Sequence, residues 1–315
     1  MSAHELHLLS RAKMFNGHQE QYRCFSETCQ TDMTFGIYLP PQVLKGYPAP
    51  VLYFLSGLNS DGSELIHQTG IQSFAAQWNI IVVFPDTSPR GSHISDSTDE
   101  FIGQGAGFYI DATEQPWAAH YQMYSHISDS ANEFIGQGAG FYLDATERPW
   151  AAHYQMYNHI SRELPDWVER HFPATQERSI AGFSMGGHGA LSIALKNPDC
   201  YAAVSAFAPL CHPTASRGGK QAFAAYLGAE SEAWQAYDST SLVQTTSRKL
   251  PIFIDQGGTD PLFPDELQPE AFVNAARANG FNVQYKVRPG YGHDYFFIAS
   301  FIDSHIEFHA EALGL

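Results

Sequence analysis

Short apolar runs bounded by turn residues recur along the chain, and amphipathic stretches lie between several of them. The runs are at 51–55, 80–84, 179–183, 202–207, 252–255 and 283–287. Apolar runs of this length, enclosed by turn residues, are typical of buried strands. Patterns with helical spacing lie at 187–196, 270–278 and 295–310. Strands that alternate with helices predict an α/β class of fold, with a mostly parallel central sheet and helices on both faces.

The first forty residues follow a different pattern. Segments 6–14, 21–26 and 34–39 have strand character and no helical pattern between them. This arrangement favours antiparallel strands at one edge of the sheet. Because α/β folds of about this length are often one unit, we expect residues 1–315 to form a single domain.

An internal repeat interrupts the alternation. Residues 93–125 recur as residues 126–158, and only five positions differ: Thr98 and Ala131, Asp99 and Asn132, Ile110 and Leu143, Gln115 and Arg148, Ser125 and Asn158. A solenoid usually needs three or more units to bury a continuous face. We therefore interpret the pair as a tandem duplication within one domain.

Each repeat unit combines a glycine-rich loop with a helix signal. The helix is expected to begin near Thr113 in the first unit and Thr146 in the second, with proline in its first turn. The second unit runs directly into 163–168, which continues the helical pattern. Our hypothesis is that the second unit keeps its place in the domain and that the first is extruded near the rim of the functional site.

Charge and hydropathy exclude several classes of partner. The formal net charge is −16, which repels nucleic acid and anionic membranes because such partners require clustered cations. No apolar run reaches the roughly 18 residues of a membrane span, and the first residues lack signal-peptide character. A cytoplasmic location is expected. The four cysteines show no metal-ligand spacing, so free thiols are expected.

The motif Gly182-Phe183-Ser184-Met185-Gly186 is the one G-x-S-x-G in the chain. It lies between a predicted strand and a predicted helix, which is the context of a nucleophile elbow in an α/β-hydrolase fold. Small residues flank the serine there because the turn is sharp. Ser184 is therefore the candidate nucleophile.

A serine nucleophile needs a base, and histidine suits that role near neutral pH. His293 lies in a glycine-rich loop after the last predicted strand. The orienting carboxylate is expected between serine and histidine in chain order. Asp260 fits, since it lies just past the strand at 252–255, and Asp255 at the strand end is the alternative. His188, beside the nucleophile, is expected to be a packing residue.

The negative oxygen of a tetrahedral intermediate requires two N–H donors, usually from the residue after the nucleophile and from an earlier loop. Met185 and Leu58 occupy those places. Tyr109 and Tyr142 are equivalent in the two repeat units and are candidates for lining the substrate pocket, which only one of them can occupy.

Several stretches together resemble one family, S-formylglutathione hydrolase, also called esterase D. The resemblance covers nearly the whole chain, and its specific stretches are 37–41, 55–58, 85–91, 105–109 through 116–117, 184–189, 255–257 and 295–298. It implies hydrolysis of S-formylglutathione to formate and glutathione by Ser184, Asp260 and His293, with the oxyanion held at Leu58 and Met185. It also implies no metal, no cofactor, a small acyl thioester or ester as substrate, and a homodimer.

This sequence departs from the family pattern in ways that bear on substrate preference. The family has a single copy of the repeated unit, and it tends to have tryptophan where this chain has Gly218. A smaller residue there is expected to widen the acyl pocket for longer esters. Two alternatives follow: a general short-chain carboxylesterase or acyltransferase on the same triad, and a non-catalytic binding protein whose pocket the repeat blocks.

Overall fold

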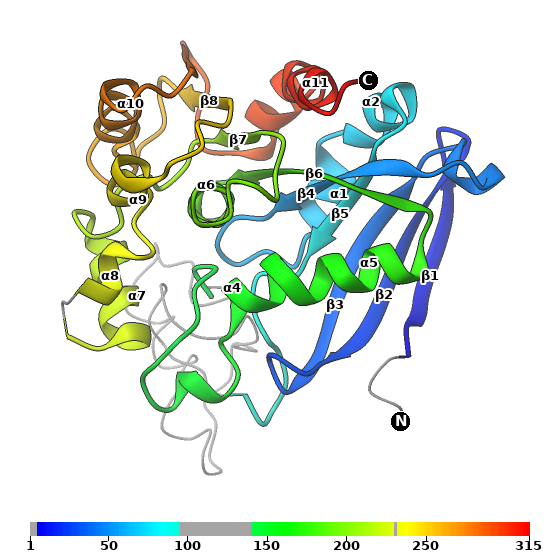
Figure 1. Cartoon of the computed structure of the whole chain (residues 1–315), viewed down its shortest axis with the longest axis horizontal. Coiled ribbons are helices and arrows are strands. Elements are labelled where there is room, and N and C mark those ends of the chain that lie inside the picture. Colours follow the sequence, from blue (N-terminus) through cyan, green and yellow to red (C-terminus); the bar gives the residue numbers. More distant parts are fainter. Residues whose placement is uncertain (1–4, 95–139, 230–231) are drawn as a thin grey trace, which may run out of the picture.

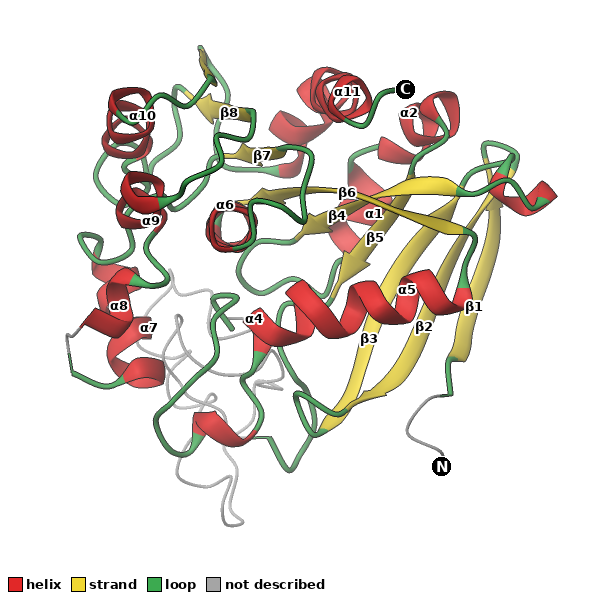
Figure 2. Ribbon diagram, in the orientation of Figure 1, coloured by secondary structure: helices red, strands yellow, loops and turns green. Residues whose placement is uncertain are grey.

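A nine-stranded sheet runs through the protein in a computed structural model that describes residues 5–94, 140–229 and 232–315 (Figures 1 and 2). The spatial order is β1-β2-β3-β5-β4-β6-β7-β8-β9. The strands are β1 (His7–Met14), β2 (Gly17–Ser26), β3 (Thr31–Leu39), β4 (Ala49–Leu55), β5 (Ile81–Pro85), β6 (Ala174–Phe183), β7 (Val204–Phe207), β8 (Ile252–Gly257) and β9 (Val283–Arg288).

The pairing confirms the fold class expected from the sequence. Strands β1, β2, β3 and β5 pair antiparallel, and β5, β4, β6, β7, β8 and β9 pair parallel. Each of the six predicted buried runs corresponds to one parallel strand, and the three N-terminal segments form the antiparallel edge. Since parallel strands end at the same edge of a sheet, the loops after β4, β6, β8 and β9 gather there, where α/β proteins place their sites.

Helices cover both faces of the sheet. Figure 1 shows α1, α2 and α11 on one face and α5 and α6 on the other. No helix in the described part of the chain is long and apolar enough to cross a membrane. The helices are η1 (Val43–Lys45), α1 (Ser63–Gln68), α2 (Ile71–Trp78), η3 (Trp150–Ala152), α4 (Met156–Asn158), η4 (His159–Glu163), α5 (Leu164–His171), α6 (Met185–Lys196), α7 (Arg217–Leu227), α8 (Glu232–Gln235), α9 (Ser239–Thr245), α10 (Pro269–Ala278) and α11 (Tyr295–Ala312).

Two local predictions are wrong. The run at 283–287 is not a fully buried strand, because β9 lies at the end of the sheet and Val287 is 43% exposed. The helix expected to begin near Thr146 is also absent. The N–H groups of Thr146 and Glu147 both donate to the carbonyl oxygen of Tyr226, and only a single turn, η3, forms before α4. Contacts with a distant segment therefore override the local helix signal.

The end of the second repeat unit is part of the hydrophobic core. Tyr142, Leu143, Tyr154 and Met156 are fully buried. From Met156 onward α4, the π-helical turn η4 and α5 follow without interruption, which confirms that the second unit continues as a helix into 163–168. Of the first unit only residues 93 and 94 are described. Residues 95–139 lie outside the described residues, so the place of the first unit stays a prediction.

Glu163 connects this helix to the antiparallel edge of the sheet. Its carboxylate accepts hydrogen bonds from the Ser26 hydroxyl, the main-chain N–H of Glu27 and the His159 ring. Burial acts to raise the pKa of Glu163, but these hydrogen bonds and the charge of His159 outweigh it and lower the pKa to about 2. The ionised carboxylate therefore stabilises the folded state.

Glu163→Gln is expected to lower the free energy of unfolding at pH 7 by about 2 to 3 kcal/mol. Because the folded-state pKa lies below the unfolded value, the contribution is complete above about pH 4.5 and is lost as the pH falls toward 2. Urea unfolding of both proteins at pH 7 and pH 3 measures it. If the free energies of unfolding of the two proteins differ by the same amount at pH 7 and pH 3, this assignment is contradicted. Glu311→Gln, at an exposed site, is the control.

Deletion of residues 93–125 is expected to leave a folded protein, because His126 and Ile127 then follow residue 92 in place of the identical His93 and Ile94. Deletion of residues 126–158 gives a protein of the same length. It places Ser125 at the position of Asn158, whose side-chain amide donates to the carboxylate of Asp144 at 2.6 Å. Losing a hydrogen bond to a charged group costs about 2 kcal/mol, so the second deletion should melt a few degrees lower. Thermal unfolding compares them. If neither deletion variant folds, both repeat units are integrated into the core or an interface.

Candidate active site

Ser184 stands between β6 and α6 on a sharply turned backbone. Its φ of 56° and ψ of −117° are unusual for a residue with a side chain, and such strain persists only where the surroundings impose it. A Cβ on Gly182 would lie 2.0 Å from the carbonyl oxygen of Gly186, and one on Gly186 would lie 2.2 Å from that of Leu55. Only glycine fits at these two places, so the motif is required by close backbone contacts.

His293 lies between the serine and a carboxylate. Its Nε2 is 2.9 Å from Oγ of Ser184, and its Nδ1 is 2.7 Å from Oδ2 of Asp260. The Asp260 side chain is fully buried, and the side chain of His293 is 16% exposed. The structure thus brings together the three side chains singled out in the sequence, although 109 and 33 residues separate the partners.

Two loops hold the imidazole and the carboxylate in place. The N–H and the hydroxyl of Thr259 both donate to the carbonyl oxygen of Tyr291, at 2.9 and 2.8 Å. A Cβ on Gly257 would meet the carbonyl oxygen of Gly292 at 2.4 Å. Asp294 caps α11 by accepting from the N–H of Phe297. The residues on either side of His293 are therefore held by contacts of the main chain and by the Asp294 cap.

Three donors surround the Asp260 carboxylate. Besides His293, Nε2 of Gln256 donates to Oδ2 at 3.0 Å and the N–H of Leu262 donates to Oδ1 at 2.8 Å. Burial acts to raise the pKa of Asp260, but the hydrogen bond and charge of His293, together with these donors, hold the pKa below its usual range. Asp260 is therefore ionised at neutral pH and can stabilise a positively charged imidazole.

Gln256 is a site residue that sequence reasoning did not single out. The only available signal was its place in the stretch Asp255-Gln256-Gly257, just ahead of the acid. Asp255, the alternative acid, is engaged elsewhere: its carboxylate pairs with Arg288 at 2.8 Å and lies 3.5 Å from His305. These partners lie on β9 and α11, so Asp255 belongs to an ion-pair network separate from the triad.

The predicted oxyanion donors lie on two segments in mutual contact. Met185 is the first residue of α6, where an N–H has no partner within the helix. Leu58 belongs to the loop after β4, and this loop lies against the elbow: a Cβ on Gly57 would be 3.2 Å from the Phe183 ring. The arrangement suits two main-chain N–H groups that converge beside Ser184.

The remaining predicted residues lie in varied positions. Tyr142 is fully buried and its hydroxyl donates to the carbonyl oxygen of Ser56, so its side chain lies behind the oxyanion loop and has no exposed surface. Tyr109 lies outside the described residues. Gly218 is buried near the start of α7 and its N–H donates to Glu266. His188 is fully buried between the rings of Phe141 and Phe223, and burial lowers its pKa to about 4.

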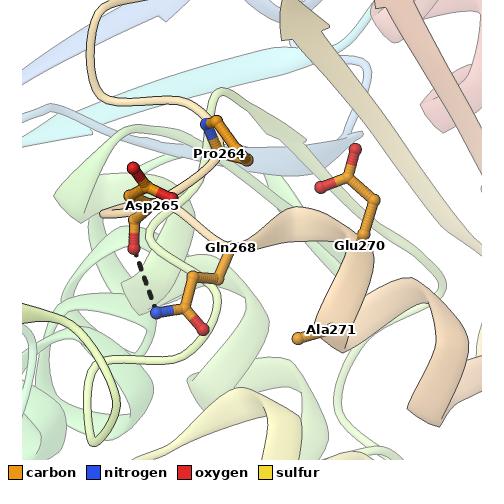
Figure 3. Close-up of a pocket in the computed structure, with 5 residues that line it drawn as sticks. All are labelled: Pro264, Asp265, Gln268, Glu270 and Ala271. Atoms are coloured by element: carbon orange, nitrogen blue, oxygen red, sulfur yellow. Dashed lines mark hydrogen bonds between the residues drawn. The ribbon is translucent and has the colours of Figure 1, made fainter.

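Other features of the described residues are separate from this constellation. A surface hollow of about 380 Å³ is formed by the loop after Asp260 and the start of α10, and no triad residue lines it; Figure 3 shows its lining of Pro264, Asp265, Gln268, Glu270 and Ala271. Within residues 5–94, 140–229 and 232–315, no group of three or more histidine, cysteine or acidic side chains is arranged to hold a metal ion.

The chain is similar to esterases of known family and known structure. A model of the Esterase family matches residues 26–129 and 125–308. An S-formylglutathione hydrolase from Agrobacterium tumefaciens is 37% identical, with a TM-score of 0.83 over 97% of this chain and 99% of that chain.

More distant structures share the fold alone. An S-formylglutathione hydrolase from Staphylococcus aureus is 17% identical, with a TM-score of 0.61 over 97% of this chain and 99% of that one. A ferulic acid esterase from Anaeromyces mucronatus is also 17% identical, with a TM-score of 0.61 over 94% and 92% of the two chains.

The family model matches most of the chain, and the relative from Agrobacterium tumefaciens is 37% identical over nearly its whole length. It follows that the chain belongs to the esterase family and is a serine hydrolase of the S-formylglutathione hydrolase type.

Proposed function

We propose that the protein hydrolyses the thioester S-formylglutathione to formate and glutathione through an acyl-enzyme on Ser184. The observation that carries this proposal is the imidazole of His293 hydrogen-bonded at once to the Ser184 hydroxyl and to the ionised Asp260 carboxylate. The identity to the hydrolase from Agrobacterium tumefaciens supports the choice of substrate. We also propose a homodimer, which is what the resemblance of the sequence to its family implies.

Acylation begins when Nε2 of His293 accepts the proton of the Ser184 hydroxyl as Oγ attacks the thioester carbonyl carbon. The carbonyl oxygen becomes an oxyanion and accepts hydrogen bonds from the N–H groups of Leu58 and Met185. Asp260 keeps its hydrogen bond to Nδ1 and stabilises the imidazolium. The carbon–sulfur bond then breaks, and His293 returns the proton to the leaving thiolate.

Deacylation repeats these steps with water. His293 accepts a proton from a water molecule, the hydroxide attacks the formyl ester, and the same two N–H groups hold the second oxyanion. The bond between carbon and Oγ breaks, Ser184 recovers its proton from His293, and formic acid leaves and gives its proton to solvent to become formate. No further reactant is needed.

A second candidate function is that of a general short-chain carboxylesterase or acyltransferase on the same triad. Gly218 favours it, since a glycine in place of a bulky aromatic leaves more room for the acyl group. The two functions share all of the chemistry above and differ in the acyl group and in the alcohol or thiol that leaves.

Ser184→Ala is expected to lower kcat by at least about 10,000-fold, because removing the nucleophile of a triad leaves only the contribution of the oxyanion site and binding. Hydrolysis of a chromogenic acetyl ester measures it, with the melting temperature as a check of folding. Ser300→Ala, at an exposed site on α11, is the matched control and should keep full activity. A near-normal rate in the Ser184 variant would disprove the assignment.

Gly218→Trp tests the substrate class. If the protein is an S-formylglutathione hydrolase, kcat/KM for S-formylglutathione should exceed that for alkyl esters, and the tryptophan should lower kcat/KM for a butyrate ester about 10-fold while affecting the formyl substrate little. Gly218→Ala is the control for the loss of glycine. If the unmodified protein has a higher kcat/KM for the butyrate ester than for S-formylglutathione, the first function is contradicted and the second is supported.

A further inference from the structure

Tyr142 links the second repeat unit to the loop that carries the predicted oxyanion donor. Its side chain is fully buried, and its hydroxyl donates to the carbonyl oxygen of Ser56 at 3.0 Å. Its ring packs against α6, since a Cβ on Gly189 would lie 2.3 Å from the ring. One side chain therefore touches both segments that supply the oxyanion donors, and no step of the proposed reaction uses it.

The oxyanion loop is held at both of its ends. At the first end, two contacts restrain the carbonyl oxygen of Ser56. A Cβ on Gly186 would lie 2.4 Å from this oxygen, so the elbow packs closely against it, and the Tyr142 hydroxyl donates a hydrogen bond to it. At the far end, the hydroxyl of Thr87 and the guanidinium of Arg90 both donate to the carbonyl oxygen of Ser60. The N–H of Leu58 lies between these two anchors.

The backbone that presents Tyr142 is in an unusual conformation. Phe141 and Tyr142 both have positive φ, 46° and 53°, which is unfavourable for residues with side chains and persists only where the surroundings impose it. Phe141 packs against the rings of His188 and Phe223. The N–H of Leu143 donates to the carbonyl oxygen of Gly140 across these two residues, so a packed turn fixes the direction of the tyrosine.

We propose that Tyr142 is a positioning residue for the oxyanion hole, acting through the Ser56 carbonyl. This inference rests on the proposed function. The Ser56 carbonyl shares its peptide plane with the N–H of Gly57, and the next plane carries the N–H of Leu58. Holding the first plane leaves only the φ and ψ rotations of Gly57 between the anchored carbonyl and the Leu58 N–H, which restricts the directions that this N–H can take. A donor aimed in advance at the developing oxyanion stabilises the transition state, whereas a mobile donor must be ordered during the reaction.

The position of Tyr142 in the chain gives the duplicated unit a role in the site. Tyr142 belongs to the unit 126–158, and the oxyanion loop comes from the segment after β4. The hydroxyl of one residue in this unit thus sets the geometry of a loop 86 residues earlier in the chain.

Tyr142→Phe tests the proposal because it removes only the hydroxyl. Complete loss of one oxyanion donor lowers turnover about 100 to 1,000-fold, so loss of its alignment is expected to lower kcat about 10-fold with KM nearly unchanged. Tyr38→Phe is the matched control: Tyr38 is also fully buried and donates to a main-chain carbonyl, that of Met14 at 3.1 Å, on the antiparallel edge. Each variant loses one such bond and should lose similar stability.

A second measurement separates positioning from a purely structural role. Phenylboronic acid adds to a nucleophilic serine and forms a tetrahedral anion whose oxygen occupies the oxyanion hole. Its dissociation constant should rise about 10-fold in Tyr142→Phe and stay unchanged in Tyr38→Phe, while the inhibition constant of glutathione stays the same in both. Titration with the boronate counts only folded protein, so partial unfolding cannot imitate the effect.

An unchanged kcat and unchanged boronate affinity in Tyr142→Phe, with a melting temperature lowered as in Tyr38→Phe, would overturn the proposal and leave Tyr142 as a packing residue. This outcome is distinct from failure of the proposed function, which would appear as full activity in Ser184→Ala or as a wild-type protein without hydrolase activity.

Discussion

The hydrogen bonds that His293 makes on its two sides are the interaction on which the rest of the site depends. They require three loops to end within reach of one another, and the parallel register of β6, β7, β8 and β9 brings those loops to one edge. The contacts of Thr259 with Tyr291 and of Gly257 with Gly292 join the acid loop to the base loop. The main-chain bond from the N–H of Thr259 to Tyr291, together with the bond from the Thr259 hydroxyl, thus holds the loop of Asp260 against the loop of His293.

Much of this arrangement could be predicted from the sequence. Apolar runs bounded by turn residues located the parallel strands of the described residues. The reason is that strands inside a sheet covered on both faces must be apolar throughout, and β9 at the edge is the exception. Ser184 could be located because the sharp turn demands glycine at Gly182 and Gly186. Chain order and the position of strand ends then selected Asp260 and His293 from many acidic residues and histidines, and the structure places these side chains within hydrogen-bonding distance.

The parts that sequence did not predict depend on contacts between distant segments. The hydrogen bond from Tyr142 to Ser56 spans 86 residues and leaves no periodic signal. Gln256 donates to Asp260 only because the strand end and the following turn bring them together. The helix expected at Thr146 fails to form because its N–H groups find a partner in Tyr226, and strand β9 is partly exposed because it lies at the edge.

The most direct test of the triad is the site and rate of labelling by a fluorophosphonate, which reacts covalently with an activated serine. The account predicts that peptide mass spectrometry finds the label on Ser184, and that His293→Gln, which keeps a polar side chain but removes the base, slows labelling by at least about 1,000-fold. A label on another serine, or equal labelling rates in the parent protein and the His293 variant, would contradict it.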